Sequence, residues 1–166
     1  MIVLETARLT LRRVTLEDAP FVLEVLLDPG YMRFVADRGV RTVEGAARYI
    51  EEKFLPSYEQ HGFGFYLMEL KIDGTPIGIC GLAKRETLDD VDVGYSVVER
   101  FAGNGYAFEA AAGVMHYARQ VLGLPRIVGI TGIDNVASAK VLEKIGLRFE
   151  KMIELPGYEG ESRLFM

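Results

Sequence analysis

The feature that most constrains the fold is a strand pattern that passes through a glycine-rich turn into a helix pattern. The strand pattern covers residues 88–98, the turn contains Gly103 and Gly105, and an alanine-rich stretch follows. The first amides of a helix lack intrahelical partners and carry partial positive charge. Glycines at that point let an anion such as a phosphate approach those amides closely. The segment therefore predicts a phosphate-binding turn or, as the alternative, a turn whose glycines serve backbone geometry alone.

The turn fits one of the known phosphate-binding patterns. It lacks the lysine and hydroxyl residue of a P-loop, and Phe108 stands where a dinucleotide-binding turn needs a third small residue. Residues 100–105, Arg-Phe-Ala-Gly-Asn-Gly, instead resemble the sequence Arg/Gln-x-x-Gly-x-Gly/Ala. That sequence is the acyl-CoA pyrophosphate loop of the GNAT superfamily of N-acetyltransferases. The resemblance implies an acyl-CoA ligand at this turn.

Two further segments resemble the same superfamily and follow its order along the chain. Residues 135–147, NVASAKVLEKIGL, resemble the family's Asn-x-x-Ser/Ala…Gly-Phe segment. Residues 6–12, TARLTLR, followed by Glu17-Asp18-Ala19, resemble the N-terminal segment of the ribosomal-protein N-terminal acetyltransferase branch. Any one of these segments is weak alone, whereas together they span nearly the whole chain and point to this branch.

The length and net charge of the chain limit its number of domains and its classes of partner. The 166 residues suit a single domain over 1–166, and 49% hydrophobic and 26% charged residues are typical of a soluble globular protein. The net charge is −5 and the pI about 5.2, so sequence-independent binding of nucleic acid has no electrostatic basis. We expect no nucleic-acid partner.

The chain shows no sign of secretion, membrane insertion or metal binding. Cys80 is the only cysteine, which excludes an intrachain disulfide and fits a reducing cytoplasm. No signal peptide is evident at the N-terminus, and no apolar run is long enough to span a bilayer. His61 and His116 lack ligand-spaced companions. We therefore expect a cytoplasmic protein without a metal, in which Cys80 is a small core residue.

Hydrophobic periodicity and turn residues predict alternating helices and strands. Strands are expected over residues 8–13, 63–72, 77–83, 88–98, 126–131, 147–155 and 162–166. Helices are expected over residues 15–27, 43–59 with a bend near Pro56, 106–122 and 135–145. The order matches the α+β GNAT fold, a mixed, mostly antiparallel twisted sheet of about seven strands flanked by about four helices. The resemblance also implies that the fourth and fifth strands, residues 88–98 and 126–131, splay apart to admit the pantetheine arm.

The resemblance assigns the co-substrate and the chemistry. It implies acetyl-CoA, no metal, and direct attack by an amine in a ternary complex, so that no covalent nucleophile is needed. Unpaired backbone groups at Val97 and Val98 are expected to bind pantetheine. The residues of the pyrophosphate loop are expected to be Ala102, Gly103, Asn104, Gly105, Tyr106 and Ala107. Arg100 either adds charge to the phosphates or is simply solvated.

The second motif supplies a candidate for assisting the leaving thiolate. Asn135 matches the residue that commonly hydrogen-bonds the pantetheine arm, although asparagine is also a strong helix N-cap. Many family members place a proton-donating tyrosine seven residues later, where this chain has Leu142. Ser138 matches the serine of the ribosomal-protein branch and is our candidate donor. Its alternative role is that of an ordinary serine in the first turn of a helix.

The expected general base is Asp92. Residues of the 88–98 strand alternate, and Asp92 shares a face with Gly94 and Ser96, opposite Val91, Val93 and Tyr95. If that face lines the acceptor cleft, the carboxylate reaches the amine directly or through water; otherwise Asp92 is a solvent-facing strand residue. Weaker candidates for the base are Glu69, Glu154 and Glu159.

The sequence does not determine which amine accepts the acetyl group or what oligomeric state the protein has. Five aromatic residues are candidates for lining the acceptor pocket: Tyr31, Phe34, Tyr66, Tyr95 and Tyr158. The branch resemblance favours the α-amine of a protein N-terminus, such as that of a ribosomal protein. A small-molecule amine (antibiotic, polyamine or amino acid) is the alternative, because one fold hosts many acceptors. A third reading, a non-catalytic acyl-CoA-binding regulatory module, rests only on Leu142. The protein is expected to be a monomer or a homodimer.

Overall fold

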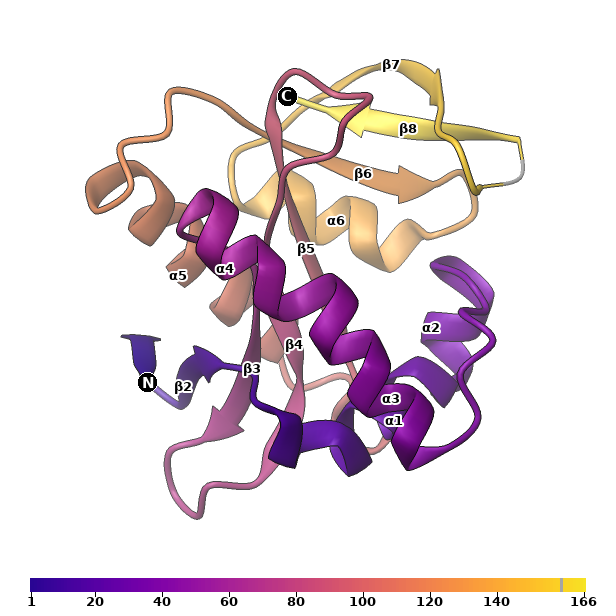
Figure 1. Cartoon of the computed structure of the whole chain (residues 1–166). Helices are drawn as coiled ribbons and strands as arrows, with labels where there is room; N and C mark the ends of the chain where they lie inside the picture. Colours follow the sequence, from indigo (N-terminus) through magenta and orange to yellow (C-terminus); the bar gives the residue numbers. More distant parts are fainter. Residues whose placement is uncertain (159) are drawn as a thin grey trace.

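One mixed sheet organises the chain, and in residues 1–158 and 160–166, which the computed structural model describes, it has eight strands (Figure 1). Their bounds are β1 Ile2–Glu5, β2 Leu9–Arg13, β3 Phe65–Leu70, β4 Pro76–Ala83, β5 Val91–Val97, β6 Ile127–Gly132, β7 Phe149–Glu154 and β8 Glu161–Phe165. The spatial order is β1-β2-β3-β4-β5-β6-β8-β7. All neighbouring pairs are antiparallel except β5 and β6, which run parallel.

In the part of the chain that the structure describes, six α-helices connect and cover these strands. Their bounds are α1 Ala19–Leu27, α2 Pro29–Phe34, α3 Val43–Tyr49, α4 Leu55–His61, α5 Tyr106–Gln120 and α6 Val136–Lys144. Short 3-10 turns, η1 Leu16–Asp18 and η3 Glu99–Phe101, precede α1 and α5, and a π-helical segment, η2 Ile50–Phe54, joins α3 to α4. No helix in the described part of the chain is both long enough and apolar enough to cross a membrane.

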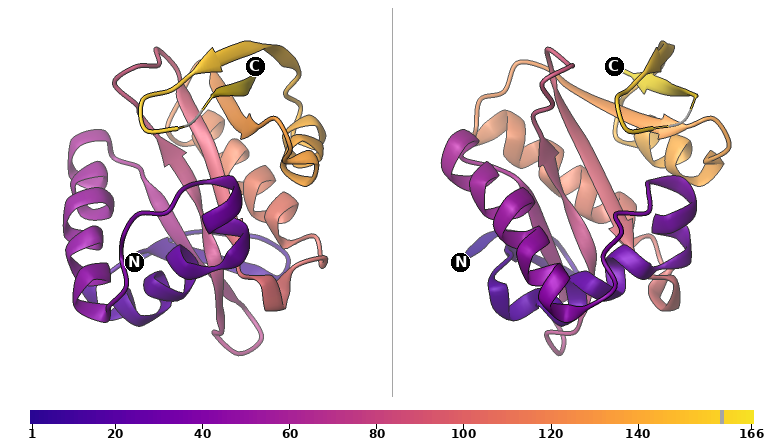
Figure 2. Two further views of the ribbon diagram at one scale, coloured as in Figure 1. Left: turned by 90° about the vertical axis from the view of Figure 1, so that its right-hand side faces the viewer. Right: turned by 45° about the vertical axis from the view of Figure 1, so that its right-hand side comes forward.

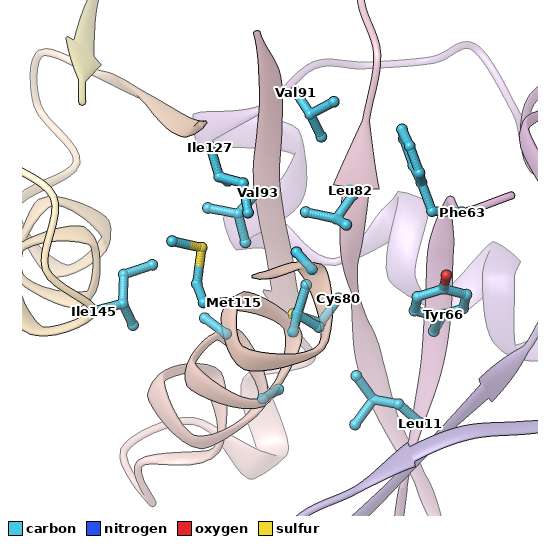
Figure 3. Packing of buried hydrophobic residues seen from close by; sticks show 14 of the residues in the cluster. Leu11, Phe63, Tyr66, Cys80, Leu82, Val91, Val93, Met115, Ile127 and Ile145 are labelled. Atoms are coloured by element: carbon cyan, nitrogen blue, oxygen red, sulfur yellow. The ribbon is translucent and has the colours of Figure 1, made fainter. Parts of the chain in front are cut away.

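Helices cover both faces of the sheet, so the strands bury side chains in two directions (Figure 2). In β3, Leu67 packs into the cluster formed with α1, α2 and α3, whereas Tyr66 and Met68 pack into the larger cluster with α5. This is the period-two alternation of a strand buried on both faces. Figure 3 shows the larger cluster, where Met115 of α5 lies near Val93 of β5 and Ile127 of β6.

The expected α+β fold is confirmed, with two elements beyond the prediction. The β1 strand pairs with β2 but is only four residues long and lacks a clear apolar alternation. The α2 helix begins at Pro29, where we expected only the end of α1. Asp28 accepts a hydrogen bond from the Gly30 N–H (3.2 Å) and so caps α2. Proline suits the first turn of a helix because its missing N–H would be unpaired there anyway.

The predicted bend near Pro56 is a change of helix type. Pro56 occupies the first turn of α4, directly after the π-helical segment Ile50–Phe54. A proline inside an α-helix removes one hydrogen bond and crowds the carbonyl four residues earlier. The wider turn absorbs that conflict without ending the helical run, so the chain from Val43 to His61 stays helical along the sheet.

The expected splay between the fourth and fifth strands of the prediction is confirmed at β5 and β6. Their parallel pairing consists of Val91 with Ile127, Asp92 with Val128, and Val93 with Gly129. Beyond Gly129, β6 pairs with β8, and the β5 residues 94–97 pair only with β4. One backbone edge of β5 therefore lies open over residues 94–97.

Close contact between β3 and β4 predicts a stability difference between two strand glycines. A Cβ atom at Gly81 would lie 2.1 Å from the carbonyl oxygen of Gly64, whereas a Cβ atom at Gly132 would have no heavy atom within 4 Å. Gly81→Ala should lower the free energy of unfolding by at least about 1–3 kcal/mol, because the backbone must shift to relieve the clash. Gly132→Ala should change it by less than about 0.5 kcal/mol. Urea denaturation measures both, and equal stability of the two variants would contradict this packing.

Candidate active site

A cavity of about 800 Å³ opens where β5 and β6 separate. Its walls come from the open end of β5, the end of β6, the first turns of α6, α2 with the loop after it, and the β7–β8 loop. Among its lining residues are Asp92, Tyr95, Asn135, Ser138 and Tyr158. The splay thus brings residues distant in sequence, including both predicted catalytic residues, Asp92 and Ser138, to one hollow.

Asp92 lies at the base of this cavity and is 3% exposed. Its Oδ2 accepts a hydrogen bond from Arg85 Nε at 3.2 Å, whereas its Oδ1 is buried and has no partner among the described residues. Burial raises the pKa of Asp92 above its usual range, and the Arg85 charge opposes that shift. Asp92 is therefore not a solvent-facing strand residue; it lines the cavity, as do Val93 and Tyr95 of the opposite face.

A chain of guanidinium and phenol groups extends from Asp92 towards the cavity mouth. The Arg85 guanidinium lies 5.6 Å from the centre of the Tyr158 ring. Arg38 donates to the Tyr31 hydroxyl at 3.2 Å and to the Tyr158 hydroxyl at 3.5 Å. Residues of α2, the loop after it and the β7–β8 loop thereby share one polar wall.

The aromatic candidates divide between cavity and core. Tyr31, Phe34, Tyr95 and Tyr158 line the cavity, as expected. Tyr66 is 1% exposed and stacks on Tyr58 within the larger core cluster. The expectation that Tyr66 lines the pocket is wrong, because β3 directs this side chain towards the α5 face.

Ser138 and Tyr95 meet across the opening between β5 and α6. The Tyr95 hydroxyl lies 2.9 Å from Ser138 Oγ and 2.9 Å from the Ser138 carbonyl oxygen. Tyr95 comes two residues after Val93, the last residue of β5 that pairs with β6. The sequence predicted Tyr95 only as a candidate for lining the acceptor pocket. It did not predict the contact between Tyr95 and Ser138.

Asn135 is the N-cap of α6. Its Oδ1 accepts a hydrogen bond from the Ser138 N–H at 3.1 Å, which confirms the capping role considered for it. Leu142, one turn after Ser138, is 1% exposed and packs on β6, with Cδ2 2.5 Å from the place a Cβ atom would take at Gly129. Gly129 thus leaves the space that Leu142 fills.

The glycine-rich turn leads into the N-terminus of α5, as predicted. Gly103 and Gly105 both have positive φ (78° and 77°), and Gly105 is the N-cap of the helix. A Cβ atom at Gly103 would have nothing within 4 Å, so the turn is open on that side. Asn104 braces the turn by donating through Nδ2 to the carbonyl oxygens of Phe101 and Ala102 (3.1 and 3.3 Å). Tyr106 and Ala107 form the first turn of the 15-residue helix.

The N-terminal segment braces this turn through contacts that the sequence did not predict. Arg8 donates from Nη2 to the Asn104 carbonyl oxygen (3.0 Å) and from Nε to Glu109 Oε1 (2.7 Å). Its guanidinium also lies 4.4 Å from the centre of the Tyr106 ring. Glu109 in addition accepts hydrogen bonds from the Thr6 hydroxyl and the Arg8 N–H. Thr6 and Arg8 belong to residues 6–12, the N-terminal segment that resembles the family. That resemblance was the one signal in the sequence that pointed to these residues.

Arg100 forms an ion pair with Glu24 of α1, and its guanidinium lies 5.2 Å from the centre of the Phe101 ring. Its charge therefore has a protein partner beside the loop, so neither of the two predicted descriptions, phosphate ligand or merely solvated residue, covers this contact. The ion pair ties the 3-10 turn η3 to α1.

The two positions predicted to offer unpaired backbone groups to pantetheine differ. The Val98 N–H donates to the Ile77 carbonyl oxygen and the Val98 carbonyl oxygen accepts from the Phe101 N–H (both 2.9 Å), so the expectation of unpaired backbone groups at Val98 is wrong. Successive amides of a strand point to opposite edges. The Val97 N–H therefore points away from β4, towards the edge where β6 has separated.

The remaining carboxylate candidates lie elsewhere. Glu69 pairs with Arg12 (3.1 Å) on β3, and Glu154 is exposed on β7, the strand at the edge of the sheet. Glu159 lies outside the described residues. Cys80 is buried, and burial raises the pKa of its thiol well above the usual range, so it packs in the core rather than acting as a thiolate.

A partly parallel, splayed sheet with a glycine turn at the start of the following helix defines an acyl-CoA N-acyltransferase fold. A protein-family model described as an acetyltransferase (GNAT) domain matches residues 8–148. The chain belongs to this family and is an acyltransferase enzyme, an N-acetyltransferase.

Individual relatives agree with this assignment. An uncharacterized N-acetyltransferase, YoaA, of Bacillus subtilis (strain 168) is 29% identical over 160 residues, which are 95% of this chain and 89% of YoaA. The crystal structure of an acetyltransferase from Agrobacterium tumefaciens str. C58 aligns with a TM-score of 0.82 and 26% identity, covering 99% of this chain and 93% of the other. An acetyltransferase from Salmonella typhimurium, described as modifying the N-terminal serine of L7/L12, has the same fold, with a TM-score of 0.80 at 17% identity and coverage of 99% and 97%.

The turn before α5 predicts how glycine substitutions affect binding of acetyl-CoA. A ligand that binds only the native state raises the melting temperature. Acetyl-CoA should raise that of the wild type, whereas Gly105→Val should abolish the shift because a side chain at the N-cap crowds Arg8 Nη2, which braces the turn, and displaces the amides at the helix start. Gly123→Val is the matched control, since Gly123 follows the other end of α5 and also has positive φ (67°). Both variants carry a similar backbone strain, so a full shift in Gly105→Val would show that the loop is not the phosphate site.

Proposed function

We propose that this enzyme transfers the acetyl group of acetyl-CoA to a primary amine, with the α-amine of a protein N-terminus, such as that of a ribosomal protein, as the favoured acceptor. The observation that carries the proposal is the cavity at the β5–β6 opening, which Ser138 and Asp92 both line. The similarity to the Salmonella typhimurium enzyme and to the ribosomal-protein branch supports a protein acceptor.

Acetyl-CoA would reach this cavity along the open edge of β5. Its pyrophosphate would lie on the amides at the start of α5, next to Gly103 and Gly105, where the helix dipole favours negative charge. The free Val97 amide would hold the pantetheine arm, with Asn135 near the opposite wall. The thioester would then lie beside Ser138, with the acceptor on the far side next to Asp92.

Transfer proceeds by direct attack. The neutral amine nitrogen bonds to the acetyl carbon, and the C–S electron pair leaves on the CoA sulfur. Asp92 makes the amine neutral by taking a proton from the incoming ammonium, through water, because its side chain is almost fully covered. The proton that the nitrogen loses after the attack passes to solvent. Ser138 donates a hydrogen bond to the departing thiolate. A thiol pKa of about 8.5 makes a strong acid unnecessary at this step.

A small-molecule amine is the second candidate acceptor. A relative from Aspergillus fumigatus, named FsC-acetyl coenzyme A-N(2)-transacetylase, is 30% identical over 150 residues, which are 87% of this chain and 64% of the relative. The two acceptor classes are separated by measuring acetylated product with acetyl-CoA and a panel of peptides with free N-termini, polyamines, amino acids and aminoglycosides. Product from peptides alone supports the first candidate, and product from small amines alone overturns it. Binding of CoA with no product from any amine would indicate a regulatory module instead.

The role of Ser138 predicts a loss of turnover rather than of binding. Ser138→Ala should lower kcat by about 10- to 1000-fold, the range of acid–base contributions, and should leave the affinity for acetyl-CoA nearly unchanged. Steady-state kinetics and a thermal shift with acetyl-CoA measure the two quantities. An unchanged kcat would reduce Ser138 to a residue of the first turn of α6.

The raised pKa of Asp92 predicts a pH-dependent loss in Asp92→Asn. The carboxylate is a base only above its own pKa, so wild-type activity rises as the pH passes through that value. The variant lacks this base, and its rate should follow the neutral fraction of the amine, whose pKa is about 8 for an α-amine. The ratio of wild-type to variant activity should therefore be largest at acidic pH above the pKa of Asp92 and shrink towards pH 8.

A pH–rate profile of kcat/KM tests this prediction. Asparagine can still accept the hydrogen bond from Arg85, so the wall of the cavity is kept. Asp90→Asn is the matched control, since Asp90 lies just before β5 and approaches Arg126 (4.0 Å) outside the cavity. Parallel profiles for wild type and Asp92→Asn would reject Asp92 as the base.

A further inference from the structure

We propose that Tyr95 is a positioning residue for acetyl transfer, whose hydroxyl fixes the direction of the Ser138 hydroxyl. The inference rests on the proposed function, because it concerns the group that assists the leaving thiolate. Ser138 lies in the first turn of α6 and Tyr95 on the open end of β5, so the pair spans the cleft that would hold the thioester.

The geometry gives the Tyr95 hydroxyl two possible acceptors. It lies 2.9 Å from the Ser138 carbonyl oxygen and 2.9 Å from Ser138 Oγ, but it has a single proton to donate. If that proton goes to the carbonyl oxygen, the serine hydroxyl can in turn donate to the tyrosine oxygen. If it goes to Oγ, the serine proton is free to point into the cavity. The second arrangement directs the serine proton away from Tyr95, towards the cavity and the CoA sulfur.

The setting of Tyr95 keeps it a donor. Its ring packs against the larger core cluster, and burial raises the pKa of the phenol above its ordinary value, an effect that the hydrogen bond with Ser138 partly opposes. The phenol therefore stays protonated at working pH and can donate a hydrogen bond to Ser138. Its contribution is a hydrogen bond that orients and polarises the Ser138 hydroxyl.

The surrounding residues explain why this pair has the task. Leu142, on the next turn of α6, carries no hydroxyl and is buried over Gly129. Among the described residues that line the cavity, Tyr95 is the one whose hydroxyl is within hydrogen-bond distance of Ser138 Oγ. The Tyr95 hydroxyl on β5 thus supports the Ser138 hydroxyl on α6 as a hydrogen-bond donor.

Atoms, electrons and protons balance in the acetyl-transfer step. The amine nitrogen bonds to the acetyl carbon, the C–S bond breaks, and its electron pair remains on sulfur. Ser138 Oγ–H donates a hydrogen bond to that sulfur while Tyr95 donates to Ser138 Oγ. The amine's proton leaves through water, and the thiolate takes a proton from solvent. No oxidant, reductant or covalent intermediate is involved.

A double-mutant cycle tests the coupling. Tyr95→Phe, Ser138→Ala and the double variant are assayed with acetyl-CoA and whichever peptide or amine of the panel gives product. Tyr95→Phe should lower kcat by about 3- to 10-fold, the value of one oriented hydrogen bond, with less than a twofold change in KM for acetyl-CoA. In the Ser138→Ala background the same change should have no further effect on kcat.

Tyr66→Phe is the control, because it removes a phenol from the neighbouring sheet core, outside the cavity, and should leave kcat unchanged. An equal loss from Tyr95→Phe in both backgrounds, or a loss confined to the KM for acetyl-CoA, would overturn the inference. In either case the wild type would still turn over substrate, so the proposed function would be unaffected. Absence of product from the wild type with every amine would instead overturn the proposed function, and the inference with it.

Discussion

The pairing between β5 and β6, which stops after Val93 and Gly129, is the constraint on which the rest of the site depends. Three residue pairs hold the two strands together, and beyond them each strand keeps only its outer neighbour. The open edge leaves the Val97 amide unpaired by β6 and makes room for the cavity. Asp92 and Tyr95 belong to one strand but reach opposite faces of the sheet, so the opening gives both access to one space.

The glycine-rich turn before α5 depends on a second, long-range constraint. Glu109 in the first turn of α5 accepts hydrogen bonds from Thr6 and Arg8 near the start of the chain, and Arg8 also contacts the loop carbonyl of Asn104. These contacts are charge-assisted and therefore among the stronger hydrogen bonds. They orient the turn from behind and leave its other side, at Gly103, open. The connection between β1 and β2 thus supports the turn without lining the cavity.

The sequence predicted those parts of the fold and site that local chemistry determines. The strand–turn–helix at residues 91–120 and the Asn135 cap follow from periodicity and from the conformational freedom of glycine. The direction of Asp92 followed from strand alternation, but its burial beside Arg85 did not, because no local pattern reports a contact between a loop and a strand. The same limit applies to Tyr66, Val98 and Arg100, whose partners are set by sheet register and by packing between distant elements.

Leu142 has a consequence for how the cleft is maintained. Its side chain occupies the space above Gly129, the last β6 residue that pairs with β5, so it is built into the point where the two strands part. Side-chain packing therefore supports the two strands at the start of the opening. A slot that is shaped by packing orders few residues when an arm enters it, and more of the contact free energy remains as affinity. The leucine that stands where many family members have a proton-donating tyrosine thus also shapes the start of the cleft.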